Sequence, residues 1–182
     1  STTVDPIALS GPLFWDQGED LAAWNQAPEE APLIPGYRAL ICAAPTEYGK
    51  NLASRESLTW EELDRARWGV LAEDSILGYR GLNLWLADHY EGNTISDLSQ
   101  VKVYDSFAAL LRAAADGTAD LFPMDESQRE DWAEAWSLPQ DETDSRGNAG
   151  FGRPGSIWEE VPVLGLTDWF YDMAIAASPT RS

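Results

Sequence analysis

The pattern of apolar and polar positions is most regular between residues 67 and 125. Short apolar runs that read as strands alternate there with stretches whose apolar residues recur every three or four positions, as Leu82, Trp85 and Leu86 do. Strands that alternate with helices predict a parallel sheet with right-handed crossovers. The predicted strands are 68–71, 101–104 and 119–124, and the predicted crossover helices are 75–90 and 106–115.

Further elements are predicted on both sides of this unit. Thr59 and Glu62 have the spacing of a capping box, which predicts a short helix that ends near Arg65. Residues 46–57 read as a loop or a weak turn. The other predicted elements are a buried strand at 37–44, a helix at 127–137, and strands at 161–166 and 173–177.

We predict two regions of different character. Residues 1–36 form an irregular, proline-rich segment that contains at most a short helix at 19–26 and is held to its neighbours by Trp15 and Trp24. Residues 37–182 form a single α/β domain. Its stretch 139–156 is polar and rich in glycine, so we expect a mobile loop there. The stretch lacks the spacing of a phosphate-binding loop, so no nucleotide-binding role is expected.

Charge is the outstanding feature of the composition. Thirty-one acidic against 12 basic residues give a net charge of −19, which disfavours nucleic acids and anionic membranes as partners. The acidic surface is consistent with a salty or extracytoplasmic environment, and also with cationic partners. No apolar run is long enough to span a bilayer. The single cysteine, Cys42, is expected to be a buried, inert thiol.

Several short motifs resemble one family. Tyr37-Arg38-Ala39-Leu40-Ile41, Ala115-Asp116-Gly117-Thr118-Ala119-Asp120 and Val163-Leu164-Gly165-Leu166-Thr167-Asp168 are similar in order and type to segments of type II periplasmic solute-binding proteins. Within that family they most resemble the phosphate/phosphite/phosphonate-binding branch of ABC transporters, over residues 37–177. The resemblance implies an α/β fold: a periplasmic-binding-protein-like lobe with a mainly parallel sheet flanked by helices.

The resemblance also implies where a ligand would bind. Asp74-Ser75-Ile76-Leu77-Gly78-Tyr79 is similar to the turn with which the family holds an oxyanion at a helix N-terminus. The ligand-binding residues expected on this basis, with the aromatic turn near the C-terminus included, are Asp74, Ser75, Gly78, Tyr79, Asp105, Ser106, Asp125, Thr167 and Trp169. The alternative is that Asp74 and Ser75 are helix caps and the aromatic residues are core.

This chain departs from the family pattern at the turn itself. Leu77 stands where the family has a second hydroxyl, and Glu73 and Asp74 add two carboxylates beside the site. Nearby carboxylates oppose an anion, so we expect a neutral or cationic solute. No cofactor or metal site is expected.

Two functions remain open. The first is a non-catalytic, solute-binding domain for ABC-type uptake or sensing in the periplasm or another extracytoplasmic compartment. The alternative is a one-lobed relative that serves as an accessory or structural subunit of a larger protein complex, with a membrane complex as one case. Residues 1–36 are too short to supply a first lobe, so we expect the turn 167–172 or residues 12–24 to be buried against another polypeptide. An enzyme is not expected, because His89 is the only histidine and no catalytic set is forced by spacing.

Overall fold

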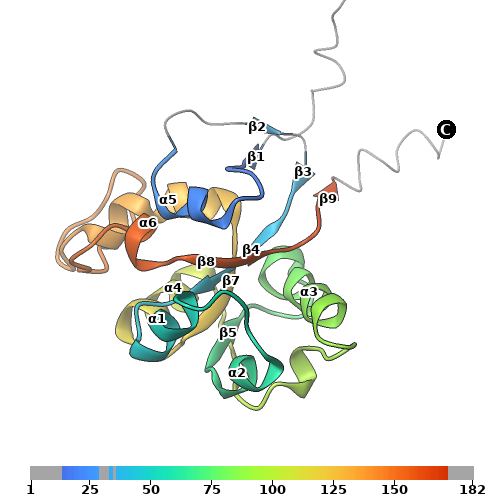
Figure 1. Cartoon of the computed structure of the whole chain (residues 1–182). Helices are drawn as coiled ribbons and strands as arrows, with labels where there is room; N and C mark the ends of the chain where they lie inside the picture. The colour runs from blue at the N-terminus through green and yellow to red at the C-terminus, as the bar shows by residue number, and fades with distance from the viewer. Residues whose placement is uncertain (1–13, 29–32, 35, 172–182) are drawn as a thin grey trace, which may run out of the picture.

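The computed structural model describes residues 14–28, 33–34 and 36–171 (Figure 1). Its elements in chain order are β1 (Phe14–Trp15), the 3₁₀ helix η1 (Leu21–Asn25), β2 (Leu33–Ile34), β3 (Gly36–Tyr37), β4 (Ala39–Ala43), α1 (Glu47–Ala53), α2 (Trp60–Arg65), β5 (Trp68–Val70), the π-helical turn η2 (Ile76–Arg80), α3 (Gly81–His89), the 3₁₀ helix η3 (Ile95–Asp97), β6 (Val101–Val103), α4 (Phe107–Asp116), β7 (Leu121–Asp125), α5 (Glu126–Ser137), α6 (Ile157–Glu160), β8 (Val163–Leu166) and β9 (Phe170–Tyr171).

A five-stranded mixed sheet with the strand order β6-β5-β7-β4-β8 forms the centre of the fold. β5 is parallel to both β6 and β7, which confirms the parallel arrangement predicted for these three strands. β4 is antiparallel to β7 and to β8, so it runs against the other four strands. The α/β fold class is therefore confirmed.

Helices cover both faces of the sheet, and the interior strand β4, which lies between β7 and β8, is apolar along its whole length. Leu40 and Cys42 point into a core shared with α4, α5 and α6, whereas Ile41 and Ala43 point into a core shared with α1, α2 and α3. Successive side chains of a strand point to opposite faces, so one continuous apolar run supplies both cores. Cys42 is fully buried, as expected, and burial raises the pKa of its thiol to about 11.

The predicted crossover helices form where the sequence places their caps. The Ser106 hydroxyl accepts a hydrogen bond from the Ala109 amide at the start of α4, and Gly117 ends that helix in the left-handed conformation with φ of 83°. The first crossover differs at its beginning, where the π-helical turn η2 precedes α3. Its apolar face is as predicted, since Leu82, Trp85 and Leu86 are all buried.

The expectation of a loop over residues 46–57 is wrong, because α1 occupies Glu47–Ala53. Thr46 caps this helix by accepting the Gly49 amide, 2.9 Å away. Gly49 is required by packing: a Cβ there would lie 2.3 Å from the carbonyl oxygen of Ala44. A glycine inside a helix lowers the helix propensity of the segment. Tertiary packing, rather than the local sequence, therefore stabilises α1.

The N-terminal segment 14–28 packs on the core. Trp24 is 1% exposed and belongs to the core that contains α5 and α6, as the sequence predicts for a residue that holds this segment in place. The buried Arg129 binds the Trp24 carbonyl and the Val161 carbonyl with its two terminal nitrogens, at 2.7 and 2.6 Å. The side chain of Trp15 lies outside the described part of the structure.

Arg38, between β3 and β4, binds the same segment through ion pairs. Its guanidinium forms two hydrogen bonds to the Asp16 carboxylate and two to that of Glu19, all between 2.9 and 3.1 Å. The group also lies 4.2 Å from the centre of the Trp169 ring. Asp16 and Trp24 are therefore buried by their own chain, whereas residues 19–22 between them are exposed. The division of the chain at residue 36 stays a prediction.

The remaining predictions concern the C-terminal third. The helix predicted at 127–137 is α5, and β8 matches the strand predicted at 161–166. The stretch 139–156 is irregular, with one antiparallel bridge between Thr143 and Ala149, and its mobility stays a prediction. Phe170 and Tyr171 of the aromatic turn form β9, which pairs with β3. The strand predicted at 173–177 lies outside the described residues.

Candidate functional site

A cavity of about 450 Å³ opens at the carboxyl ends of β5 and β7. These adjacent strands continue into helices on opposite faces of the sheet, because the α3 side chains pack in one core and those of α5 in the other. In open α/β sheets, ligands bind in the crevice that such a divergence creates. We name this space the switch-point cavity.

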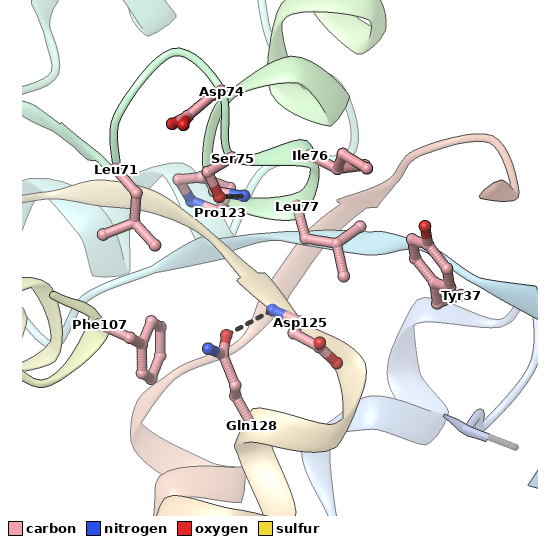
Figure 2. Close-up of a pocket in the computed structure, with 11 residues that line it drawn as sticks. Tyr37, Leu71, Asp74, Ser75, Ile76, Leu77, Phe107, Pro123, Asp125 and Gln128 are labelled. Carbon is pink, nitrogen blue, oxygen red and sulfur yellow. Dashed lines mark hydrogen bonds between the residues drawn. The ribbon is translucent and has the colours of Figure 1, made fainter. Parts of the chain in front are cut away.

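Eleven residues from four parts of the chain line the switch-point cavity. Figure 2 shows the turn with Asp74, Ser75, Ile76 and Leu77 on one side, Asp125 and Gln128 on the other, and Phe107 and Tyr37 toward opposite ends. The full lining is Tyr37, Leu71, Asp74, Ser75, Ile76, Leu77, Gly78, Phe107, Pro123, Asp125 and Gln128.

The first wall is the turn that enters η2. Ser75 caps it, with its hydroxyl accepting the Gly78 amide at 3.0 Å. Gly78 leaves no room for a side chain, since a Cβ would lie 2.6 Å from Leu71. The Ser75 hydroxyl keeps its own proton for donation to a ligand.

The opposite wall is the start of α5, which is fixed by a capping box. The Asp125 carboxylate accepts a hydrogen bond from the Ser127 amide at 2.7 Å. The side-chain oxygen of Gln128 in turn accepts one from the Asp125 amide, also at 2.7 Å. The Gln128 side-chain nitrogen has no hydrogen bond to a described residue, so it can donate to a ligand. Burial raises the pKa of the Asp125 carboxyl, and the negative charge of Asp131 raises it further.

Pro123 shows why the sheet opens at this point. A proline inside a central strand removes a ladder hydrogen bond and is disfavoured. β7 pairs with β5 only through Leu121 and Trp68, however, so the edge of Pro123 that would have faced β5 borders the cavity. The missing N–H leaves no unpaired donor in the cavity wall.

Four of the predicted site residues meet in the switch-point cavity, and five lie elsewhere. Asp74, Ser75, Gly78 and Asp125 line it. Tyr79 packs against the core of the opposite face, Asp105 and Ser106 are exposed beside α4, Thr167 accepts the Ala39 amide at 2.9 Å, and Trp169 stacks on Arg38.

The predicted site residues include none of the five apolar side chains of the lining, and they omit its polar residues Tyr37 and Gln128. Gln128 could have been found, because Asp125 and Gln128 have capping-box spacing and the box fixes the side chain beside the strand end. Leu71, Phe107 and Pro123 carry no such signal. Their role depends on where the strands diverge, which three-dimensional packing decides.

Two further properties bear on the chemistry of the chain. Among the described residues, no group of three or more His, Cys, Asp or Glu side chains is placed to hold a metal ion. In the same part of the chain, the structure contains no helix whose length and apolar character would allow it to cross a membrane.

Comparison with known proteins finds a distant structural similarity and no match in sequence. No model of a protein family matches this chain, and no curated protein matches it. The structure is similar to that of the binding-protein component of an ABC phosphonate transporter from Pseudomonas aeruginosa, with a TM-score of 0.49 and 14% sequence identity. The match covers 76% of this chain and 38% of that protein, so this chain spans well under half of that protein's length.

Proposed function

We propose that the switch-point cavity binds a small neutral or cationic solute with an apolar body, and that the chain is a non-catalytic solute-binding domain for uptake or sensing. The observation that carries this proposal is the charge of the lining. It contains the carboxylates of Asp74 and Asp125, and none of the eleven lining residues, all within the described part of the chain, is basic.

The electrostatic preference for a cation is strongest at Asp125. Burial opposes the charged form of this carboxyl, and its pKa is raised accordingly. A ligand cation beside it would compensate for the lost hydration and would favour the ionised form. An anion would add a second unfavourable charge to a site that already has an excess of negative charge.

The shape of the cavity supports a ligand that is partly apolar. Leu71, Ile76, Leu77, Phe107 and Pro123 supply hydrocarbon surface, and the polar groups are few. A volume of about 450 Å³ lies within the usual range of about 300–1,000 Å³ for small-molecule sites. Ser75 and Gln128 supply donors for a neutral polar group of the solute, such as a hydroxyl or a carbonyl.

A role in binding rather than catalysis is supported by the same lining. Ser75 is its only hydroxyl besides Tyr37, and no lining residue is a histidine, cysteine or lysine that could activate a nucleophile. Presentation of a solute outside the cytoplasm is part of the proposal, in keeping with the net charge of −19.

Calorimetric titration tests the proposal. Amines and betaines should bind to the chain, whereas phosphate and phosphonates should give no heat of binding. Asp74→Asn should weaken binding of an amine by about two- to five-fold, because this carboxylate is exposed and its attraction is partly screened. The matched control is Asp141→Asn, an exposed acid that does not line the cavity. Tight binding of a phosphonate would overturn the proposal.

A further inference from the structure

A second, smaller hollow of about 180 Å³ lies between α3 and β9 and shares no lining residue with the switch-point cavity. Leu84 and Trp85 of α3 line one side of it, and Trp169 and Phe170 line the other. Its volume is well below the range of about 300 Å³ and above that is usual for small-molecule sites. The hollow has room for a side chain rather than for a complete ligand.

The apolar part of this hollow is open to solvent. Leu84 is 54% exposed, although Leu82 and Leu86 on the same helix are fully buried. The rings of Trp169 and Phe170 are half-buried beside it. Exposed apolar surface next to aromatic rings is typical of positions that contact another polypeptide.

The rim of the hollow is acidic. Asp88 of α3 and Asp168, the residue before Trp169, are both exposed and both line it. Within the part of the chain that the structure describes, neither carboxylate takes part in an ion pair. His89 also borders the hollow, and its Nδ1 is bonded to the Trp85 carbonyl, which can only accept.

The aromatic wall already binds one guanidinium. Arg38 lies 4.2 Å from the centre of the Trp169 ring and is 2% exposed. Arg38 does not line the hollow, so the hollow meets a different part of the same indole. A guanidinium is planar and weakly hydrated, which makes arginine better suited than lysine to stack on such a ring between two carboxylates.

We propose that this hollow docks an arginine side chain of a partner polypeptide, with an apolar neighbour of that arginine covering Leu84. The charges of Asp88 and Asp168 select the cation, the indole of Trp169 selects its planar shape, and Leu84 supplies the apolar contact. This docking is independent of the solute in the switch-point cavity, because the two spaces are lined by different residues.

Nuclear magnetic resonance on the ¹⁵N-labelled full chain tests this docking. The probes are three peptides, acetyl-Leu-Arg-Leu-amide and its analogues with citrulline or glutamate in place of arginine. The arginine peptide should shift the amide signals of Leu84 and Asp88 and the indole N–H signal of Trp169. It should bind about 10-fold more tightly than the citrulline peptide, which has the same shape without the charge, and the glutamate peptide should not bind.

Variants separate this hollow from other acidic sites. Asp168→Asn should weaken the arginine peptide about five-fold, and Asp141→Asn should leave its affinity unchanged. Equal affinities for the arginine and citrulline peptides would overturn the proposal. So would shifts centred on Ser75 and Gln128, which would place the peptide in the switch-point cavity. A concentration-dependent doubling of mass that Leu84→Ser abolishes would identify a second copy of this chain as the occupant, and would also overturn it.

Discussion

Two adjacent carboxyl groups, Asp125 and Glu126, show how much the surroundings of a residue matter at the end of β7. Asp125 borders the switch-point cavity and caps α5. Glu126 is 2% exposed, accepts the Arg38 amide at 3.2 Å, and faces Asp16. Burial raises the pKa of both groups, so both are expected to affect stability, and Asp125 is expected to affect binding as well.

Asp125→Asn should separate ligand affinity from stability. The asparagine oxygen can still accept the Ser127 amide, so the cap is kept, while the desolvated charge is removed. We expect an unchanged or higher melting temperature at pH 7, together with a loss of affinity for a cationic solute of about 10-fold or more. Differential scanning calorimetry and titration of the variant beside Asp141→Asn measure both quantities. Unchanged affinity would show that Asp125 does not contact the ligand.

The stability of the chain should depend on the ionisation of Glu126. Burial, reinforced by the nearby Asp16, raises its pKa to about 10 in the folded protein. The stabilisation that follows from this raised pKa is fully present when the pH is below the ordinary pKa of a glutamate. It falls as the pH rises toward about 10, because the unfolded chain releases the proton that the folded chain keeps.

Glu126→Gln removes this dependence, since an amide does not titrate and can still accept the Arg38 amide. From about pH 5 to pH 8, the free energy of unfolding of the parent chain should fall relative to that of the variant, by up to about 1.4 kcal/mol per pH unit. Urea denaturation of both proteins across this range measures the difference. Parallel curves would mean that Glu126 is ionised in the folded state.

At the residue scale, the sequence indicated the caps better than the ligand contacts. Ser75 and Ser106 cap the elements that follow them, because a cap depends on residues only three positions away. Contacts such as those of Phe107 and Tyr37 with the cavity join segments far apart in the chain, and local pattern carries no information about them.

At the scale of elements, the alternating unit 67–125 could be predicted and α1 could not. Both crossovers form, because α3 has repeated apolar spacing and α4 has strong caps, although the first crossover begins with the π-helical turn η2. In α1, Gly49 weakens the local helical signal, and the close contact with Ala44 that favours this glycine is visible only in three dimensions. β4 runs antiparallel to its neighbours β7 and β8. This direction depends on how the chain connects β4 to the unit 67–125, which the pattern within that unit does not indicate.

The N-terminal segment should be part of the cooperative fold. Trp24→Ala should lower the free energy of unfolding by about 3–5 kcal/mol, because it leaves a large cavity in the core. Leu21→Ala on the same 3₁₀ helix is the matched control, since Leu21 is 37% exposed and should change stability by no more than about 0.5 kcal/mol. Urea denaturation provides the test, and equal small effects would show that the segment is not held by the core.

At the scale of the whole molecule, the cavity at the carboxyl ends of β5 and β7 and the acidic character of the chain favour the same kind of ligand. The net charge of −19 disfavours an anion at long range, and Asp74 and Asp125 disfavour it at contact. The acidic character was evident from the sequence. The cavity was not, because it depends on β5 and β7 separating beyond Leu121.

One calorimetric comparison measures the selectivity of the switch-point cavity for cationic over anionic solutes. Choline, its uncharged isostere 3,3-dimethyl-1-butanol and methylphosphonate are titrated into the full chain under identical conditions. We predict that choline binds at least about 10-fold more tightly than the uncharged alcohol, and that methylphosphonate gives no heat of binding. Methylphosphonate binding more tightly than choline would contradict the account.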